Sequence, residues 1–328
     1  MNPLDNILLK LGRRVYDRLY GSPRQKLKST DYDPSDILNL EDGNHLIADM
    51  LSKDKPFMIT RFGQVELSVL VDFLEMNELK SQNSKQRALS IIKGKVNCWT
   101  QRNIVEIEKN AGFFPVSDQS LTLFSETYIK CSKLIDALGV WYNYGEHVMH
   151  QQFFPNASLI PLQSIEPYYF HSPWSRLLYN KKVLVIHPFE KSIQYQYQHR
   201  KMLFENKQVL PDFELKTIKA VQSNAFNNVN YTTWFEALQS MIDEIDKTDF
   251  DVALIGAGAY GLPLAAHVKK IGKQAIHFGG SLQILFGIKG QRWDNMPNVN
   301  RFYNEYWIRP LQEETPDDFK SVENGCYW

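Results

Sequence analysis

The stretch that decides the fold is Asp251–Gly261, DVALIGAGAYG. Its first half is the short apolar run of a buried strand, and a glycine turn leads from that strand into helical spacing that ends near Lys270. Strands that alternate with helices in this way build parallel α/β sheets. Ligands of such sheets bind beyond the carboxyl ends of the strands. The stretch therefore predicts both the class of fold and the edge of the sheet where a site should lie.

The same alternation recurs along the chain. Apolar runs predict further strands at 56–60, 140–142, 158–162, 182–186, 214–218 and 274–278. We expect an α/β fold, with a Rossmann-like, mostly parallel sheet joined by right-handed crossovers and helices on both faces. A single domain is predicted over residues 53–310, after a helical extension at 1–52. Residues 311–328 are expected to form an acidic tail, solvated at the surface.

Composition narrows the function classes. Lys plus Arg and Asp plus Glu both number 37, so no net field favours nucleic acid as a partner. The three cysteines, Cys98, Cys131 and Cys326, lack metal or redox spacing and are expected to be reduced thiols. No apolar stretch is long enough to span a bilayer, and no signal peptide is recognisable. We expect a cytoplasmic protein.

The first residues have the pattern of a basic amphipathic helix. Its apolar positions are Leu4, Ile7, Leu8, Leu11, Val15 and Leu19, and its charges are Lys10, Arg13, Arg14 and Arg18. Two interpretations stay open. The helix either docks on its own domain or makes peripheral contact with the anionic inner face of the cell membrane.

The glycine turn Gly256-x-Gly258-x-x-Gly261, which contains Tyr260, is the strongest site candidate. Its backbone amides and the following helix dipole suit a diphosphate, although the glycines also fit a tight turn without a ligand. A dinucleotide fingerprint needs an acidic residue at the end of the next strand. That strand ends in His277 instead, followed by Phe278, Gly279 and Gly280, which counts against a dinucleotide.

A second candidate follows the first strand, in Arg61–Glu66, RFGQVE. Arg61 suits a phosphate, and Glu66 suits a divalent ion or the proton of an acceptor hydroxyl. A buried ion pair between the two is the structural alternative. Other strand ends add His187 and Glu190, then Ser223 and Asn224, and a glycine-rich segment leads to Arg292. For these residues, hydrogen bonding within a turn is the alternative to ligand contact.

Four short segments follow one another over about residues 55–295, namely Arg61–Glu66, Val183–Ser192, Ser223–Phe226 and Leu254–Gly261. In this order they resemble the GT-D-type glycosyltransferases of bacterial surface-polysaccharide and glycoprotein assembly. The resemblance implies transfer of a sugar, of the hexosyltransferase type, from a nucleotide donor that is typically UDP-linked to a glycan or lipid-linked hydroxyl acceptor. It also implies help from Mn²⁺ or Mg²⁺. The first motif of the family reads Arg-Phe-Gly-Asp-Gly-Glu, whereas this chain has Gln64 and Val65 before Glu66. Because one carboxylate is missing, a metal at Glu66 is in doubt.

The sequence thus predicts a set of site residues. The catalytic candidates are Glu66, Arg61 and His187, with Glu66 also the candidate metal ligand. The candidates for donor binding are Gly63, Gln64, Glu190, Ser223, Asn224, Gly256, Gly258, Tyr260, Gly261, Gly279, Gly280 and Arg292. Two other functions remain open, a nucleotide-binding Rossmann oxidoreductase and a non-catalytic binding or assembly protein of a polysaccharide pathway.

Overall fold

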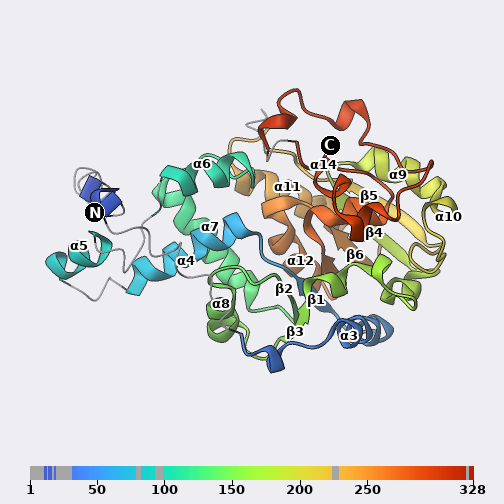
Figure 1. Ribbon diagram of the computed structural model, residues 1–328, viewed down its shortest axis with the longest axis horizontal. Coiled ribbons are helices and arrows are strands. Elements are labelled where there is room, and N and C mark those ends of the chain that lie inside the picture. Colours follow the sequence, from blue (N-terminus) through green and yellow to red (C-terminus); the bar gives the residue numbers. More distant parts are fainter. Residues whose placement is uncertain are drawn as a thin grey trace.

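A seven-stranded, all-parallel sheet forms the centre of the molecule in a computed structural model (Figure 1). The structure describes residues 11–12, 14–16, 18–19, 32–78, 83–92, 99, 101–223, 229–322 and 325–328. The strand order is β3-β2-β1-β7-β6-β4-β5. The strands are β1 (Phe57–Thr60), β2 (Ala137–Val140), β3 (Ser158–Pro161), β4 (Lys182–His187), β5 (Glu214–Lys219), β6 (Val252–Ile255) and β7 (Gln274–His277). This confirms the predicted α/β, Rossmann-like class.

Helices cover both faces of the sheet. The α-helices are α3 (Leu40–Ser52), α4 (Gln64–Glu78), α5 (Ser84–Ile92), α6 (Gln101–Lys109), α7 (Asp118–Ser132), α8 (Glu146–Phe153), α9 (Glu190–Gln198), α10 (Arg200–Leu203), α11 (Trp234–Lys247), α12 (Gly261–Lys270), α13 (Leu282–Leu285), α14 (Gln291–Asp294) and α15 (Pro297–Asn300). The short 3₁₀ helices are η1 (Pro34–Asp36), η3 (Leu162–Ile165), η4 (Pro167–Tyr169), η5 (Trp174–Leu178), η6 (Gly258–Tyr260), η7 (Gly279–Ser281), η8 (Gln312–Glu314) and η9 (Phe319–Ser321).

Successive strand residues point to opposite faces and enter two different clusters of buried side chains. In β1, Phe57 and Ile59 pack with α3, η5 and α9, whereas Met58 packs with α4, α7, α11 and α12. The same alternation runs through Val252–Ile255. Burial on both faces explains why these strands are continuous apolar runs in the sequence.

The strand expected at 140–142 is displaced, because β2 ends at Val140. The backbone amides of Trp141 and Tyr142 both donate to Oε2 of Glu146, each at 3.0 Å. Tyr142 has a φ of 57°, which no strand residue adopts. A buried carboxylate five residues further on thus turns the chain out of the sheet.

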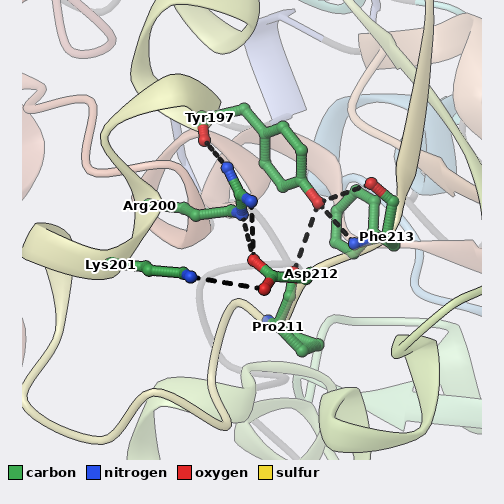
Figure 2. A network of polar contacts seen from close by, with 6 residues as sticks. All are labelled: Tyr197, Arg200, Lys201, Pro211, Asp212 and Phe213. Atoms are coloured by element: carbon green, nitrogen blue, oxygen red, sulfur yellow. Dashed lines mark hydrogen bonds and ion pairs between the residues drawn. The ribbon is translucent and has the colours of Figure 1, made fainter.

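At the edge of the sheet formed by β5, a polar network joins α9 and α10 to the residues just before this strand (Figure 2). Arg200 Nε donates to Asp212 at 2.6 Å, and the Arg200 guanidinium lies 4.5 Å from the centre of the Tyr197 ring. Tyr197 Oη donates to the carbonyl of Phe213 at 2.8 Å and accepts from its amide at 2.6 Å. These contacts hold the edge strand in place.

The segment after Pro310 does not form the solvated tail that was expected. Glu314 is 3% exposed, and Cys326 and Trp328 are also buried. Backbone bonds join this segment to α14, where Gln291 N donates to the carbonyl of Trp328 at 3.0 Å and Arg292 N to that of Cys326 at 2.9 Å. Glu313, Asp317 and Asp318 are exposed, whereas Glu314 is buried because it accepts bonds from backbone amides of α9, at Lys191 and Ser192.

Other expectations meet the structure only in part. Cys131 and Cys326 are buried, and Arg292 Nη2 donates to Cys326 Sγ at 3.3 Å. Cys98 lies outside the described residues. Of the amphipathic N-terminal segment, residues 11–12, 14–16 and 18–19 are helical. None of the helices in the described ranges is long and apolar enough to cross a membrane.

Candidate functional site

A cavity of about 390 Å³ lies over the carboxyl ends of the strands. Five strand-end segments contribute to its wall, with Arg61–Glu66 after β1, Trp141 after β2, Glu166 after β3, Gly258 after β6 and Phe278–Ser281 after β7. The remaining wall comes from the region of α14 and α15, from Tyr327, and from Asn110, Ala111, Tyr128, Tyr169 and Leu262. Segments far apart in the sequence therefore meet at the edge of the sheet that the strand pattern predicts.

Two smaller cavities adjoin the main one. A cavity of about 80 Å³ is lined by His187 and Gly256, and one of about 40 Å³ by Ser223 and Tyr260. Asn110 and Gly258 line all three cavities. The turns after β4 and β5 therefore lie beside the same region as those after β1 and β6.

The predicted site residues are distributed over these three cavities. The main cavity takes Arg61, Gly63, Gln64, Glu66, Gly258, Gly279, Gly280 and Arg292. The smaller ones take His187, Gly256, Ser223 and Tyr260. Glu190 and Gly261 line none of these three cavities. Glu190 accepts a hydrogen bond from Thr217 Oγ1 at 2.7 Å, and Gly261 packs against His277. Asn224 lies outside the described residues.

Two different structural requirements explain the three glycines of the turn after β6. A Cβ at Gly256 would lie 2.6 Å from Cδ2 of His187, and one at Gly261 would lie 2.1 Å from Nε2 of His277. Both positions therefore serve close packing against histidines at the ends of neighbouring strands. Gly258 has a φ of 52°, a left-handed conformation, and faces the cavities.

Arg61 is a half-buried cation in the cavity wall. Its guanidinium carbon lies 4.3 Å from the centre of the Trp141 ring, a cation–π arrangement. Its buried Nε has no hydrogen-bond partner within the part of the chain that the structure describes. Burial lowers the pKa of Arg61, while the charge of Glu66 opposes that shift. The side chain therefore stacks on Trp141 and also experiences the charge of Glu66.

Glu66 lies beside Arg61 at the start of α4 and is 9% exposed. Its carboxylate folds back over Gly63, because a Cβ at Gly63 would lie 1.9 Å from Oε2 of Glu66. The site thus has room for this carboxylate only if residue 63 is glycine. The proximity of Glu66 to Arg61 is compatible with both interpretations drawn from the sequence, the ion pair and the functional carboxylate.

Arg292 is the second cation of the cavity wall. Its guanidinium carbon lies 4.9 Å from the centre of the Tyr327 ring and 5.8 Å from that of Trp293. The charge of Arg292 also contributes to the lowered pKa of Arg61. The two guanidinium groups are therefore close enough to repel, and an anion between them would relieve that repulsion.

Two buried histidines flank the glycine turn. His187 Nδ1 accepts from the amide of Phe189 at 2.9 Å, which assigns the proton of the neutral ring to Nε2. His277 Nδ1 lies 2.9 Å from Thr60 Oγ1. Burial lowers the pKa of each to about 3. Both rings are therefore neutral near pH 7 and are poor proton acceptors, although His187 can donate a hydrogen bond.

Glu166 is a carboxylate of the main cavity that the sequence reasoning missed. Burial raises the pKa of Glu166 to about 7, against the opposing effects of Ser281 and Arg61. The strand-end rule applied to the segment after β3 was the signal that could have found it. Trp141, Asn110 and Tyr327 were also missed, and Tyr327 follows no strand.

A divalent metal fits the site only with help from a ligand. Within the described ranges, no three His, Cys, Asp or Glu side chains are grouped so that they could hold a metal ion. The carboxylates in the main cavity wall are Glu66 and Glu166, and the positive charge of Arg61 affects both. Mg²⁺ commonly binds one or two carboxylates plus substrate phosphates. A metal at Glu66 thus stays a prediction.

Comparisons with known proteins are sparse. No family model matches the chain, and no curated protein matches it. It is similar to a solved structure described as the selenomethionine-substituted structure of domain of unknown function 1792 (DUF1792). That likeness has 11% sequence identity and a TM-score of 0.42, and it covers 85% of this chain and 92% of the other. So distant a likeness assigns neither a fold nor a function, and the fold of this chain is assigned from its own strand order.

Proposed function

We propose that the chain is a glycosyltransferase of the hexosyltransferase type. It would move a sugar from a UDP-linked donor to a hydroxyl of a glycan or lipid-linked acceptor in bacterial surface glycan synthesis. The observation that carries the proposal is the lining of one cavity of about 390 Å³ by Arg61, Arg292 and the glycine segments at Gly258 and Gly279–Gly280. Pockets of roughly 300–1,000 Å³ hold ligands of this size.

The proposed reaction leaves a negative charge on the nucleoside diphosphate when the bond to the sugar breaks. Guanidinium groups bind phosphate through two parallel hydrogen bonds, and preorganised donors lower the barrier to such charge development. Arg61 and Arg292 are supported by aromatic rings and need little reorganisation to act. Neutral His187 would donate a further hydrogen bond from Nε2.

The same cavity has surfaces for the uncharged parts of the donor. Tyr169 and Trp293 line it, and so do the amide side chains of Gln64, Gln163 and Asn298. Aromatic rings pack on sugars and bases, and amides satisfy hydroxyl and carbonyl groups in both directions. This mixture supports a nucleotide sugar over an apolar ligand.

Mn²⁺ or Mg²⁺ remains part of the proposal, with Glu66 and the diphosphate as ligands. A bound ion would neutralise charge on the leaving diphosphate. Arg61 and Arg292 already offer positive charge to that group, so we expect an added metal to strengthen donor binding and not to be its sole basis.

The test is a thermal-shift screen with UDP, UDP-glucose, UDP-galactose, UDP-N-acetylglucosamine and NADH, with and without Mn²⁺. Ligands that bind the native state raise its melting temperature. We expect UDP and at least one UDP-sugar to do so, and Arg292→Ala to abolish the shift. Lys247→Ala should leave it unchanged, because Lys247 is exposed at the end of α11, before the amino end of β6.

The other outcomes separate the competing functions. A shift with NADH and none with UDP would contradict the proposal in favour of an oxidoreductase. Binding of UDP-sugars without release of UDP from any of them would favour a non-catalytic binding protein.

We also propose that the N-terminal segment makes peripheral contact with an anionic membrane. Leu11, Val15 and Leu19 are spaced four residues apart on helical backbone and are 50%, 59% and 69% exposed. Arg14 and Arg18 lie between them in the chain. An exposed apolar stripe with adjacent basic residues suits a surface that has both acyl chains and negative headgroups.

A further inference from the structure

We propose that Glu166 accepts the proton of the acceptor hydroxyl, which makes it a catalytic residue of the transfer step. This assignment rests on the proposed glycosyltransferase function. Glu166 lies between η3 and η4, directly beyond β3, and lines the main cavity. The GT-D resemblance does not point to this residue.

Glu166 places a carboxylate next to Arg61, one of the two arginines proposed to bind the diphosphate. Arg61, after β1, and Ser281, after β7, are near enough to alter its titration. Both also line the main cavity. A base that serves an acceptor must lie close to the anomeric carbon, which is bonded to the diphosphate. Glu166 lines the same cavity as Arg61 and Arg292, from the side that the segment after β3 contributes.

The two other side chains of the cavity wall that could act as a base, Glu66 and His277, are less suitable than Glu166. The side chains in the main cavity wall with an ordinary role as a base are Glu66, Glu166 and His277. His277 is 4% exposed, engages Thr60 through Nδ1, and has its Nε2 pressed against Gly261. Glu66 is folded over Gly63, and its charge is the largest contribution that opposes the lowered pKa of Arg61.

The titration of Glu166 suits the role. Burial raises its pKa to about 7, so the carboxylate is partly ionised near neutral pH and gains a proton at little cost. The titratable or charged groups that face it are Arg61, Tyr168 and Tyr169. Arg61 favours the ionised form, and burial raises the pKa of both tyrosines, which therefore stay neutral.

The proposed transfer forms one bond to the anomeric carbon and breaks another. An oxygen lone pair of the acceptor hydroxyl forms a bond to the anomeric carbon, while the bond from that carbon to the diphosphate oxygen breaks. The bonding pair leaves with the nucleoside diphosphate, which Arg61 and Arg292 stabilise. The hydroxyl proton moves to the carboxylate of Glu166, and no oxidant or reductant takes part.

The test uses hydrolysis of the donor, in which water is the acceptor. The full chain is supplied with UDP-glucose, UDP-galactose or UDP-N-acetylglucosamine, and UDP release is followed from pH 5.5 to 9. We expect the wild-type kcat to rise through about pH 7 as Glu166 ionises. Glu166→Gln should lower kcat by about 10²–10⁴-fold, the usual contribution of a general base, and should remove the acid limb.

Matched variants separate catalysis from positioning. Glu166→Asp should keep the acid limb with a reduced kcat, and Glu244→Gln, at an exposed site on α11, should behave as wild type. Affinity for UDP should stay within about threefold in Glu166→Gln, since removal of a general base should spare ground-state binding. Glu66→Gln should keep the acid limb.

The outcomes that overturn the proposal are distinct. If wild type releases UDP and Glu166→Gln retains its rate and acid limb, or if the limb disappears in Glu66→Gln instead, Glu166 is not the base. Loss of UDP affinity in Glu166→Gln together with kcat would indicate a positioning role and would also overturn it. No release by wild type from any donor would overturn the glycosyltransferase function itself, and the step proposed for Glu166 with it.

Discussion

At the scale of single residues, the two arginines of the cavity depend on aromatic neighbours. Arg61 lies over Trp141 and Arg292 over Tyr327. A guanidinium is planar and weakly hydrated, so it stacks on a ring and keeps its hydrogen-bond donors directed at a ligand. A lysine has the charge but lacks this planar fork. The choice of arginine is therefore part of the proposed phosphate site.

Arg61→Lys should weaken UDP binding although the positive charge is kept. Hydrogen bonds to charged groups contribute about 1.5–3 kcal/mol, so we expect the dissociation constant to rise by about 10-fold or more. Isothermal titration calorimetry with UDP would measure it, with Lys247→Ala as the control. An unchanged affinity in Arg61→Lys would show that Arg61 does not bind the diphosphate.

A second residue-scale prediction concerns Glu146, which is completely buried and turns the chain at Trp141. Burial raises the pKa of Glu146 to about 7. Because the folded-state pKa lies above the unfolded value, the folded protein binds the proton more tightly. The stability from Glu146 is therefore full at low pH and is lost as pH rises through about 7.

Glu146→Gln removes this titration and keeps an oxygen that can accept from the amides of Trp141 and Tyr142. Between pH 5 and 8 the free energy of unfolding of the variant should rise relative to wild type by about 2–3 kcal/mol. Urea unfolding of both proteins across this range gives the difference, and the groups that they share cancel from it. A difference that does not change with pH would mean that Glu146 titrates normally.

At the scale of elements, Glu314 joins η8 to the N-terminus of α9. Its carboxylate accepts from the amide of Lys191 at 2.7 Å and that of Ser192 at 3.0 Å, and from the hydroxyl of Ser192. The first amides of a helix have no partner within the helix, so a buried carboxylate satisfies them and also suits the helix dipole. This contact anchors the segment that carries Tyr327 into the cavity wall.

Glu314→Ala should therefore destabilise the fold by about 1–3 kcal/mol, the cost of buried donors without an acceptor. Urea unfolding would measure the change. Glu313→Ala is the matched control, because Glu313 is 54% exposed and pairs with an exposed Lys191, so its loss should have a much smaller effect. Equal effects of the two substitutions would contradict the anchoring role.

At the scale of the whole molecule, one sheet places every strand-end turn on the same edge. Parallel strands all end in the same direction, so residues from 61 to 327 in the sequence converge there. The membrane contact proposed for the N-terminal segment also belongs to this scale, since it would bring this site close to a lipid-linked acceptor.

The full chain should sediment with vesicles of phosphatidylcholine and phosphatidylserine, and less with phosphatidylcholine alone. Leu11→Asp combined with Val15→Asp should reduce that binding by about 10-fold or more, because each substitution removes an apolar contact with the bilayer and adds a negative charge that the anionic headgroups repel. Leu123→Asp is the control, at an apolar site 48% exposed on α7. Equal binding of the double variant would contradict membrane contact through this segment.

The sequence by itself determined the class of fold and the positions of the clearest strands. Runs such as Val183–Ile186 and Val252–Ile255 are apolar because the sheet buries both of their faces. A glycine turn marks the end of Val252–Ile255, and His187-Pro188 follows Val183–Ile186. These signals are local, so a single chain displays them. The candidate positions at Arg61 and Gly258 followed from the same strand-end rule.

Only the tertiary structure decided which of these positions share a cavity and what completes it. Glu166, Trp141 and Tyr327 have no distinguishing local pattern, and their roles depend on contacts with residues far away in the chain. The end of β2 at Val140 depends on the carboxylate of Glu146, and the burial of Glu314 depends on the free amides of α9. Packing between distant segments produces both the low dielectric around these buried carboxylates and the hydrogen-bond donors that they accept from. A short stretch of residues encodes neither of these.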